Sequence, residues 1–167
     1  LRAYNPPLFG TQMRFFLALL ACASLGVQAA APQPPSIIGK SWVLGDLSSG
    51  QVLAAQKAEE RFEPASLTKM MTAYVVFAAL RDRKLALDQQ VKVSERAWKT
   101  PGARMYLEPR RPVTVDELIR GMVVQSANDA CVALAEALAG SEEAFAQMMN
   151  RESERLGMKD TRFANAS

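Results

Sequence analysis

The distribution of apolar and polar positions divides the chain into strand-like and helical segments. Residues 41–58 alternate around the turn residues "SSG", a pattern typical of a β-hairpin. Pro64 suits the first turn of a helix, and no charged residue follows Lys69 until Arg81. We therefore expect a helix over residues 64–80 that is apolar on nearly all sides, central and buried.

The second half of the chain has a mainly helical pattern. Thr114, followed three residues later by Glu117, matches a capping box, which marks the start of a helix. Gly140 and Gly157 suit helix C-termini, and Ser141 can cap the helix that follows it. The expected elements are a strand at 90–94, a short strand at 105–107 within the loop 99–112, and helices at 114–124, 129–139 and 141–157.

These elements indicate an α+β fold. The chain offers a hairpin, one apolar helix and then a cluster of helices, with too few strands to close a sheet. We therefore expect residues 37–167 to form the N-terminal part of a larger domain.

The N-terminal segment has the pattern of a secretory signal peptide. Arg14 supplies the positive charge, an apolar stretch follows at 15–25, and Val27-Gln28-Ala29 fits a cleavage site. Cleavage is expected after Ala29, with cleavage after Ala31 as the alternative. The mature protein is then exported, to the periplasm or the cell envelope. The expected segments are upstream translated sequence at 1–12, the signal peptide at 13–29, a linker at 30–36 and the catalytic domain at 37–167.

The absence of histidine narrows the possible chemistry most. It excludes a Ser-His-Asp triad, a Cys-His dyad and any His-ligated metal within these 167 residues. The formal net charge is +3, and acidic and basic residues alternate, so nucleic-acid binding is not expected. Cys22 lies in the signal segment, and Cys131 lies in an Ala/Leu-rich helix, where a buried structural thiol is expected.

Ser66 and Lys69 form the first candidate site. Residues three apart share one helix face, so the Lys69 ammonium should reach the Ser66 hydroxyl. Burial disfavours the charged form of a lysine, and a neutral amine can take the proton of a serine nucleophile. The N–H groups of a first helical turn can also stabilise negative charge at Ser66. The alternative is a structural pair, in which Lys69 extends to solvent.

A polar break in an apolar segment supplies the second candidate site. The stretch "QSAND" (125–129) contains Ser126, which could relay a proton, and Asn128, which could contact a substrate amide. The alternative is that Asn128 or Asp129 only caps the next helix.

Two segments resemble motifs of the serine penicillin-binding enzymes, most closely the low-molecular-mass D-alanyl-D-alanine carboxypeptidases of the peptidase S11 family. "EPASLTKMMTAYVV" (63–76) is similar to their Ser-x-x-Lys motif, and "VVQSANDACVALAEALAGS" (123–141) is similar to their second motif. The resemblance covers about residues 37–165. It implies the DD-peptidase/serine β-lactamase-like fold, in which an antiparallel sheet packs with a helical cluster.

The resemblance also implies a reaction. Ser66 would form an acyl-enzyme with a peptidoglycan pentapeptide stem and release its terminal D-alanine. Lys69 would accept the serine proton, directly or through Ser126, and Asn128 would position the substrate amide. No metal or organic cofactor is implied. The implied partners are peptidoglycan stem peptides and β-lactams, which would inhibit covalently, and any membrane anchor would lie in a C-terminal region beyond these residues.

The sequence departs from the family pattern in three places. Ala127 stands where Gly or Asp is commoner, the loop 99–104 is shorter than in many relatives, and no Lys-Thr-Gly or Lys-Ser-Gly occurs. Because that third motif holds the substrate carboxylate in the family, we expect these 167 residues by themselves to be inactive. A DD-endopeptidase, a β-lactamase of the same superfamily and a non-catalytic remnant stay open as alternatives.

Overall fold

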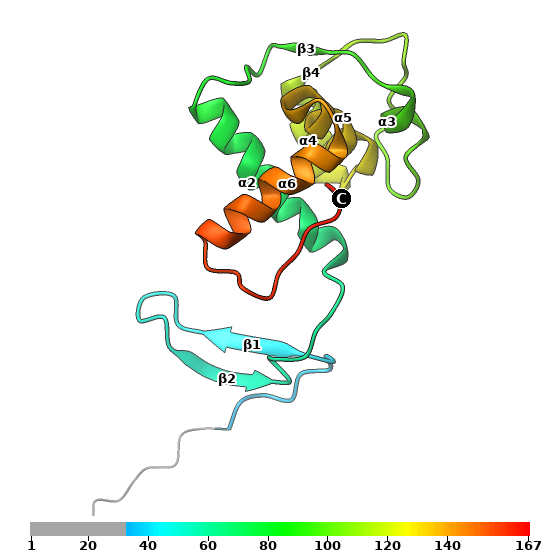
Figure 1. Cartoon of the computed structure of the whole chain (residues 1–167). Helices are drawn as coiled ribbons and strands as arrows, with labels where there is room; N and C mark the ends of the chain where they lie inside the picture. The colour runs from blue at the N-terminus through cyan, green and yellow to red at the C-terminus, as the bar shows by residue number, and fades with distance from the viewer. Residues whose placement is uncertain (1–32) are drawn as a thin grey trace, which may run out of the picture. The chain divides into compact units, whose positions relative to one another are not determined.

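The computed structural model describes residues 33–167, which form two units, a β-hairpin unit at 33–60 and a helical unit at 61–167 (Figure 1). The segments expected at 1–12 and 13–29, together with residues 30–32 of the expected linker, lie outside the described residues. No helix within 33–167 combines the length and apolar character needed to cross a bilayer.

The first unit is the predicted hairpin. Strands β1 (Trp42–Gly45) and β2 (Val52–Gln56) pair antiparallel, with a register shift next to Gly45. Both strands are shorter than the sequence pattern suggested, because the turn occupies residues 46–51 rather than "SSG" alone.

A network around Asp46 organises this turn. The Asp46 carboxylate accepts hydrogen bonds from the Ser48 and Ser49 hydroxyls and from the Ser48 N–H. The Ser49 hydroxyl, followed by the Ser48 hydroxyl, lowers the pKa of Asp46 to about 2. Gly50 closes the turn with a φ of 71°, a left-handed conformation that glycine adopts without strain.

The second unit is mainly helical and confirms the α+β class. Its two short strands pair antiparallel, with Val91 opposite Val113. Its elements are, in order, the 3-10 helix η1 (Ala65–Leu67), α2 (Thr68–Arg81), β3 (Gln90–Val91), α3 (Glu95–Lys99), β4 (Val113–Thr114), α4 (Val115–Gln125), α5 (Asn128–Ala139) and α6 (Glu142–Arg155).

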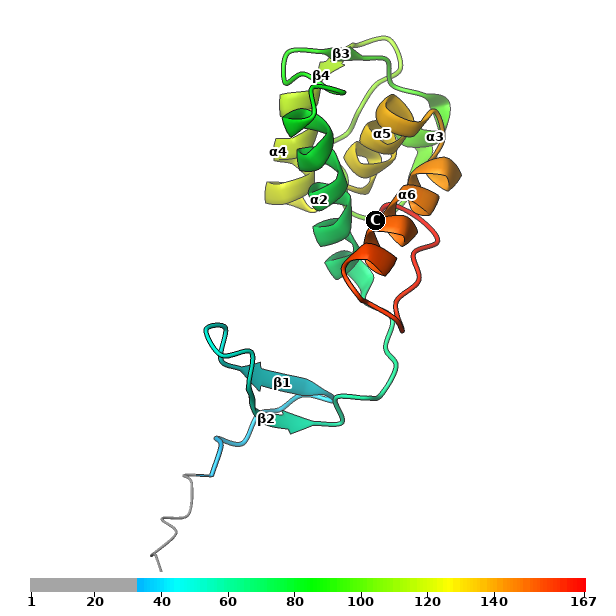
Figure 2. The same cartoon turned by 60° about the vertical axis from the view of Figure 1, so that its left-hand side comes forward.

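Helix α5 is the centre of this unit. It packs against α2, α3, α4 and α6, which surround it in both views (Figures 1 and 2). Every residue from Asp129 to Ala135 is buried. The alanines in this stretch allow the neighbouring helices to approach closely, because interaxial distance depends on the side chains at the contact.

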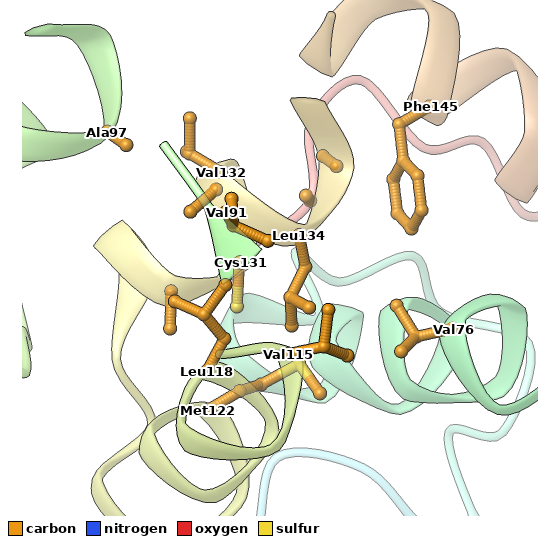
Figure 3. Packing of buried hydrophobic residues seen from close by; sticks show 14 of the residues in the cluster. Val76, Val91, Ala97, Val115, Leu118, Met122, Cys131, Val132, Leu134 and Phe145 are labelled. Atoms are coloured by element: carbon orange, nitrogen blue, oxygen red, sulfur yellow. The ribbon is translucent and has the colours of Figure 1, made fainter. Parts of the chain in front are cut away.

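The apolar core lies between these helices. Cys131 and Leu134 of α5 face Leu118 and Val115 of α4 (Figure 3). Phe145 of α6 is fully buried in the same cluster. The second unit therefore holds one continuous core.

The prediction that the apolar helix after Lys69 is central and buried on nearly all sides is wrong. Within residues 33–167 one face of α2 is open: Met70 is 71%, Phe77 49% and Tyr74 39% exposed. The opposite face packs against α5 and α6. An apolar composition does not show which helix will have neighbours on every side, and here the central position belongs to α5.

The predicted strand at 105–107 does not form. The N–H groups of Met105 and Leu107 donate to the Asp129 side chain instead of to a neighbouring strand. The partner of β3 is β4, which directly precedes α4, and β3 covers only the first two residues of the strand expected at 90–94.

Helix α3 was not predicted. Its N-cap is Ser94, whose hydroxyl accepts a hydrogen bond from the Ala97 N–H at 3.0 Å. A five-residue helix has too few apolar positions to show a clear period in the sequence.

The capping box of α4 yields a stability prediction. The Thr114 hydroxyl accepts from the Glu117 N–H, and the Glu117 carboxylate accepts from the Thr114 N–H. Thr114→Ala removes the first bond and should lower the free energy of unfolding by about 1 kcal/mol in urea titrations followed by circular dichroism. Thr161→Ala is the control, because within residues 33–167 the Thr161 hydroxyl makes no hydrogen bond. Equal losses in both variants would contradict a role for the cap.

Candidate active site

Ser66 lies in a tight turn at the start of the long helix. It belongs to η1, and the α-helical geometry of α2 begins two residues later, at Thr68. The helix therefore starts as a 3-10 turn rather than as the continuous α-helix expected from Pro64. Residues i and i+3 eclipse one another in 3-10 geometry, which favours contact between Ser66 and Lys69.

Backbone strain precedes the serine. Ala65 has a φ of 47°, which a residue with a Cβ rarely adopts and which costs about 1–3 kcal/mol. Such strain persists only where the surrounding structure imposes it, and it is found preferentially at functional sites.

Lys69 is buried and points at Ser66. Its side chain is 8% exposed, and Nζ donates to Ser66 Oγ at 3.3 Å. The alternative in which Lys69 extends to solvent does not hold. The amine and the hydroxyl are close enough for direct proton transfer after a small movement.

Ser126 completes a three-residue cluster. It is the C-cap of α4, with φ 54° and ψ 35°, and its Oγ is hydrogen-bonded to Ser66 Oγ at 3.2 Å. The left-handed conformation ends α4, and the Ser126 side chain is turned toward Ser66 of η1. The structure thus brings together Ser66, Lys69 and Ser126 from segments sixty residues apart in the chain.

Asn128 is not hydrogen-bonded to this cluster. Its Nδ2 donates to the Pro101 carbonyl at 2.8 Å, and its backbone N–H donates to the Ala103 carbonyl at 2.7 Å. Gly102 leaves room for the amide, since a Cβ there would lie 2.6 Å from Asn128 Nδ2. Asn128 therefore holds the loop at 101–103, and its expected contact with a substrate amide stays a prediction.

The simple capping role for Asn128 or Asp129 is wrong. The residue at the N-cap of α5 is Ala127, which makes no side-chain cap hydrogen bond. Asp129 is fully buried, and its carboxylate accepts hydrogen bonds from Met105, Leu107 and Ala130 N–H groups. The sequence did not predict that Asp129 holds the loop at 105–107. The sequence feature that could have indicated a buried acidic side chain is the position of Asp129 directly before the apolar stretch "ACVALA".

A cleft of about 250 Å³ opens over the cluster. Met70 and Ala73 of α2 form one wall, and Met122 and Val123 of α4 form the other. An apolar cleft with a few convergent polar groups is typical of sites for small ligands. A nucleophile, a base and a relay hydroxyl at its floor are the groups that acyl transfer requires.

Cys131 lies close to this site but is not set up to react. Burial raises the pKa of its thiol to about 12, and Sγ donates to the Ala127 carbonyl at 3.2 Å. The thiolate that would act as a nucleophile is therefore almost absent near neutral pH.

Solved structures of penicillin-binding proteins share the fold of this chain. Penicillin-binding protein 5 of Haemophilus influenzae aligns with a TM-score of 0.78 at 40% identity, over 81% of this chain and 40% of that one. Penicillin-binding protein D2 of Listeria monocytogenes, in its ampicillin-bound form, aligns with a TM-score of 0.70 at 28% identity, over 80% of this chain and 54% of that one. The fold is the DD-peptidase fold, as the resemblance implied.

The chain belongs to the D-alanyl-D-alanine carboxypeptidase family, peptidase S11, whose sequence model matches residues 28–167. A curated relative is D-alanyl-D-alanine carboxypeptidase DacC of Escherichia coli strain K12. It is 42% identical over 154 residues, which are 89% of this chain and 38% of DacC. The chain therefore spans well under half the length of this relative.

The state of Cys131 can be tested with a thiol reagent. In the folded protein at pH 8, Ellman's reagent should modify Cys131 at least about a hundredfold more slowly than in guanidinium, because unfolding restores an ordinary thiol pKa. A Cys22→Ser background removes the second thiol where the leader is retained. Rapid modification of the native protein would contradict the buried, protonated state.

Proposed function

We propose that the protein carrying this chain is a serine-type D-alanyl-D-alanine carboxypeptidase that acts on peptidoglycan pentapeptide stems. The observation that carries the proposal is the buried Lys69 amine 3.3 Å from Ser66 Oγ, with Ser126 Oγ 3.2 Å from the same oxygen. Membership of the S11 family supports the choice of substrate.

The acylation step follows from this cluster. Ser66 Oγ attacks the carbonyl carbon of the penultimate D-alanine while its proton passes to Lys69 Nζ, directly or through the Ser126 hydroxyl. The C–N bond to the terminal D-alanine then breaks, and the leaving amine takes up the proton. The product of this half-reaction is an ester on Ser66 together with free D-alanine.

In deacylation water takes the place of Ser66 as the nucleophile, and Ser66 becomes the leaving group. Water adds to the ester carbonyl while its proton passes to the same basic group, and the C–O bond to Ser66 breaks. The serine recovers its proton, and a stem shortened by one residue leaves. Negative charge on the carbonyl oxygen develops beside the first turn of η1 and α2, where backbone N–H groups without helical partners can stabilise it.

β-Lactams should follow only the first half of this path. Opening of the lactam ring leaves the amine attached to the acyl group, so no product diffuses away and the adduct persists. The ampicillin-bound form of penicillin-binding protein D2 from Listeria monocytogenes supports this expectation.

We further propose that the protein is exported to the periplasm or the cell envelope, where its substrate lies. The support is the charged and apolar pattern of residues 13–29. The proposed boundaries of the upstream segment, leader, linker and catalytic region at 1–12, 13–29, 30–36 and 37–167 rest on the same sequence pattern.

Penicillin labelling tests the nucleophile and its base. In the complete protein, Ser66→Ala should abolish the covalent adduct with a fluorescent penicillin. Lys69→Met should slow labelling by about a hundredfold or more, because the proton acceptor is lost. Ser48→Ala and Lys84→Met, both on exposed residues, serve as matched controls and should label normally. A stable adduct on Ser66→Ala, located by mass spectrometry, would refute the assignment.

Product analysis tests the reaction. Incubation with uncross-linked pentapeptide muropeptides should release D-alanine and leave tetrapeptides, with a rate that depends on Ser66. Cleavage restricted to cross-linked dimers would instead identify an endopeptidase, and rapid turnover of penicillin would identify a β-lactamase. Absence of both adduct and product in the complete protein would identify a non-catalytic protein.

A further inference from the structure

Asp129 is a fully buried acidic side chain that the proposed reaction does not use. Its side chain is fully buried, and no lysine or arginine forms an ion pair with it among residues 33–167. A buried carboxylate is stable only when its oxygens are hydrogen-bonded. Here three backbone N–H groups supply those bonds: Met105 and Ala130 to Oδ1 at 3.0 Å, and Leu107 to Oδ2 at 3.1 Å.

These bonds give the loop at 105–107 a defined shape. The N–H groups of Met105 and Leu107 both point at one carboxylate, so the residue between them is turned outward. Tyr106 accordingly has a φ of 62° and is 76% exposed. A tyrosine in the left-handed region is strained, and the two bonds to Asp129 help to hold it there.

The loop in turn contacts the end of α4. Met105 packs its sulfur over Gly121, where a Cβ would collide with Met105 Sδ. The Gly121 carbonyl accepts hydrogen bonds from the N–H groups of both Ser126 and Ala127. Gly121 thus lies between the Met105 side chain and the backbone turn that presents Ser126.

We propose that Asp129 is a positioning residue for Ser126. The Asp129 carboxylate accepts the Met105 N–H and so keeps the Met105 side chain in contact with Gly121. This contact maintains the last turn of α4. In that conformation Ser126 Oγ lies within hydrogen-bonding distance of Ser66 Oγ. The expected effect of Asp129 on acylation rests on the proposed function. The claim that Asp129 fixes the backbone turn at Ser126 concerns the fold alone.

The test uses an isosteric change in the complete protein. Asp129→Asn keeps the volume but replaces one acceptor oxygen by an NH₂ group, so a single amide oxygen is left for the N–H groups of Met105, Leu107 and Ala130. The matched control is Glu142→Gln, another buried carboxylate, which accepts the Ala166 N–H at 3.1 Å and pairs with Arg96 away from this loop. Circular dichroism and the melting temperature establish that each variant is folded.

The first readout is the second-order rate constant for acylation by a fluorescent penicillin. Asp129→Asn should slow acylation by about tenfold or more, whereas Glu142→Gln should stay within about threefold of the parent. In a Ser126→Ala background the same Asp129→Asn change should cost less than about twofold, because two residues that act through one another are not additive. If Asp129 had only a general structural role, Asp129→Asn would slow acylation by the same factor in the parent and in the Ser126→Ala protein. That result would overturn the proposal.

The second readout does not depend on activity. Hydrogen exchange should accelerate at the Ser126 and Ala127 amides in Asp129→Asn but not in Glu142→Gln. Unchanged exchange would overturn the positional claim. If the parent protein forms no penicillin adduct, the proposed function fails, and hydrogen exchange alone decides whether Asp129 holds this turn.

A variant that leaves Asp129 intact covers the case in which Asp129→Asn does not fold. Met105→Ala removes the side chain that contacts Gly121 but keeps the Met105 N–H and Asp129, and it should reproduce both the Ser126-dependent loss of acylation and the faster exchange. Parent-like behaviour of a folded Met105→Ala protein would overturn the proposal.

Discussion

The burial of the first half of α5 is the constraint on which the helical unit depends. Between Asp129 and Ala135 no side chain reaches solvent, so four other helices are arranged around this stretch. Close packing of this kind leaves little freedom for the neighbouring elements to shift. Helix α2, which carries Lys69 and follows the η1 turn of Ser66, packs against α5, and so does α4, which ends at Ser126. The relative placement of α2 and α4 therefore follows from α5.

The polar groups of the site lie where this packing ends. A buried helix must satisfy its free N–H groups and any charge at its first turn without water. In α5 this is done through the loop at 101–107, because Asn128 and Asp129 bind the backbone of that loop rather than each other. The same contacts therefore hold the loop in place and stabilise the helix. The Ser66, Lys69 and Ser126 cluster instead lines the cleft between α2 and α4.

Local chemical patterns predicted much of the fold. The hairpin, the capping box at Thr114 and the helix ends at Gly140 and near Gly157 were found because each depends on residues close together in the chain. Features set by distant partners were missed. The stretch 105–107 looks like a strand, but its N–H groups are taken by Asp129, more than twenty residues away. The apolar face of α2 looks like core, yet Met70 and Phe77 are exposed in the described structure.

The sequence by itself determined which chemistry is available. It contains no histidine, so a serine nucleophile needs another base, and a Ser-x-x-Lys spacing places a lysine one turn away by local geometry alone. Only the tertiary structure decided that this lysine is buried and that Ser126 meets Ser66. It likewise decided that Asn128 and Asp129 hold a loop. These outcomes depend on contacts between segments far apart in the chain, and such contacts are selected by the packing of all the helices together.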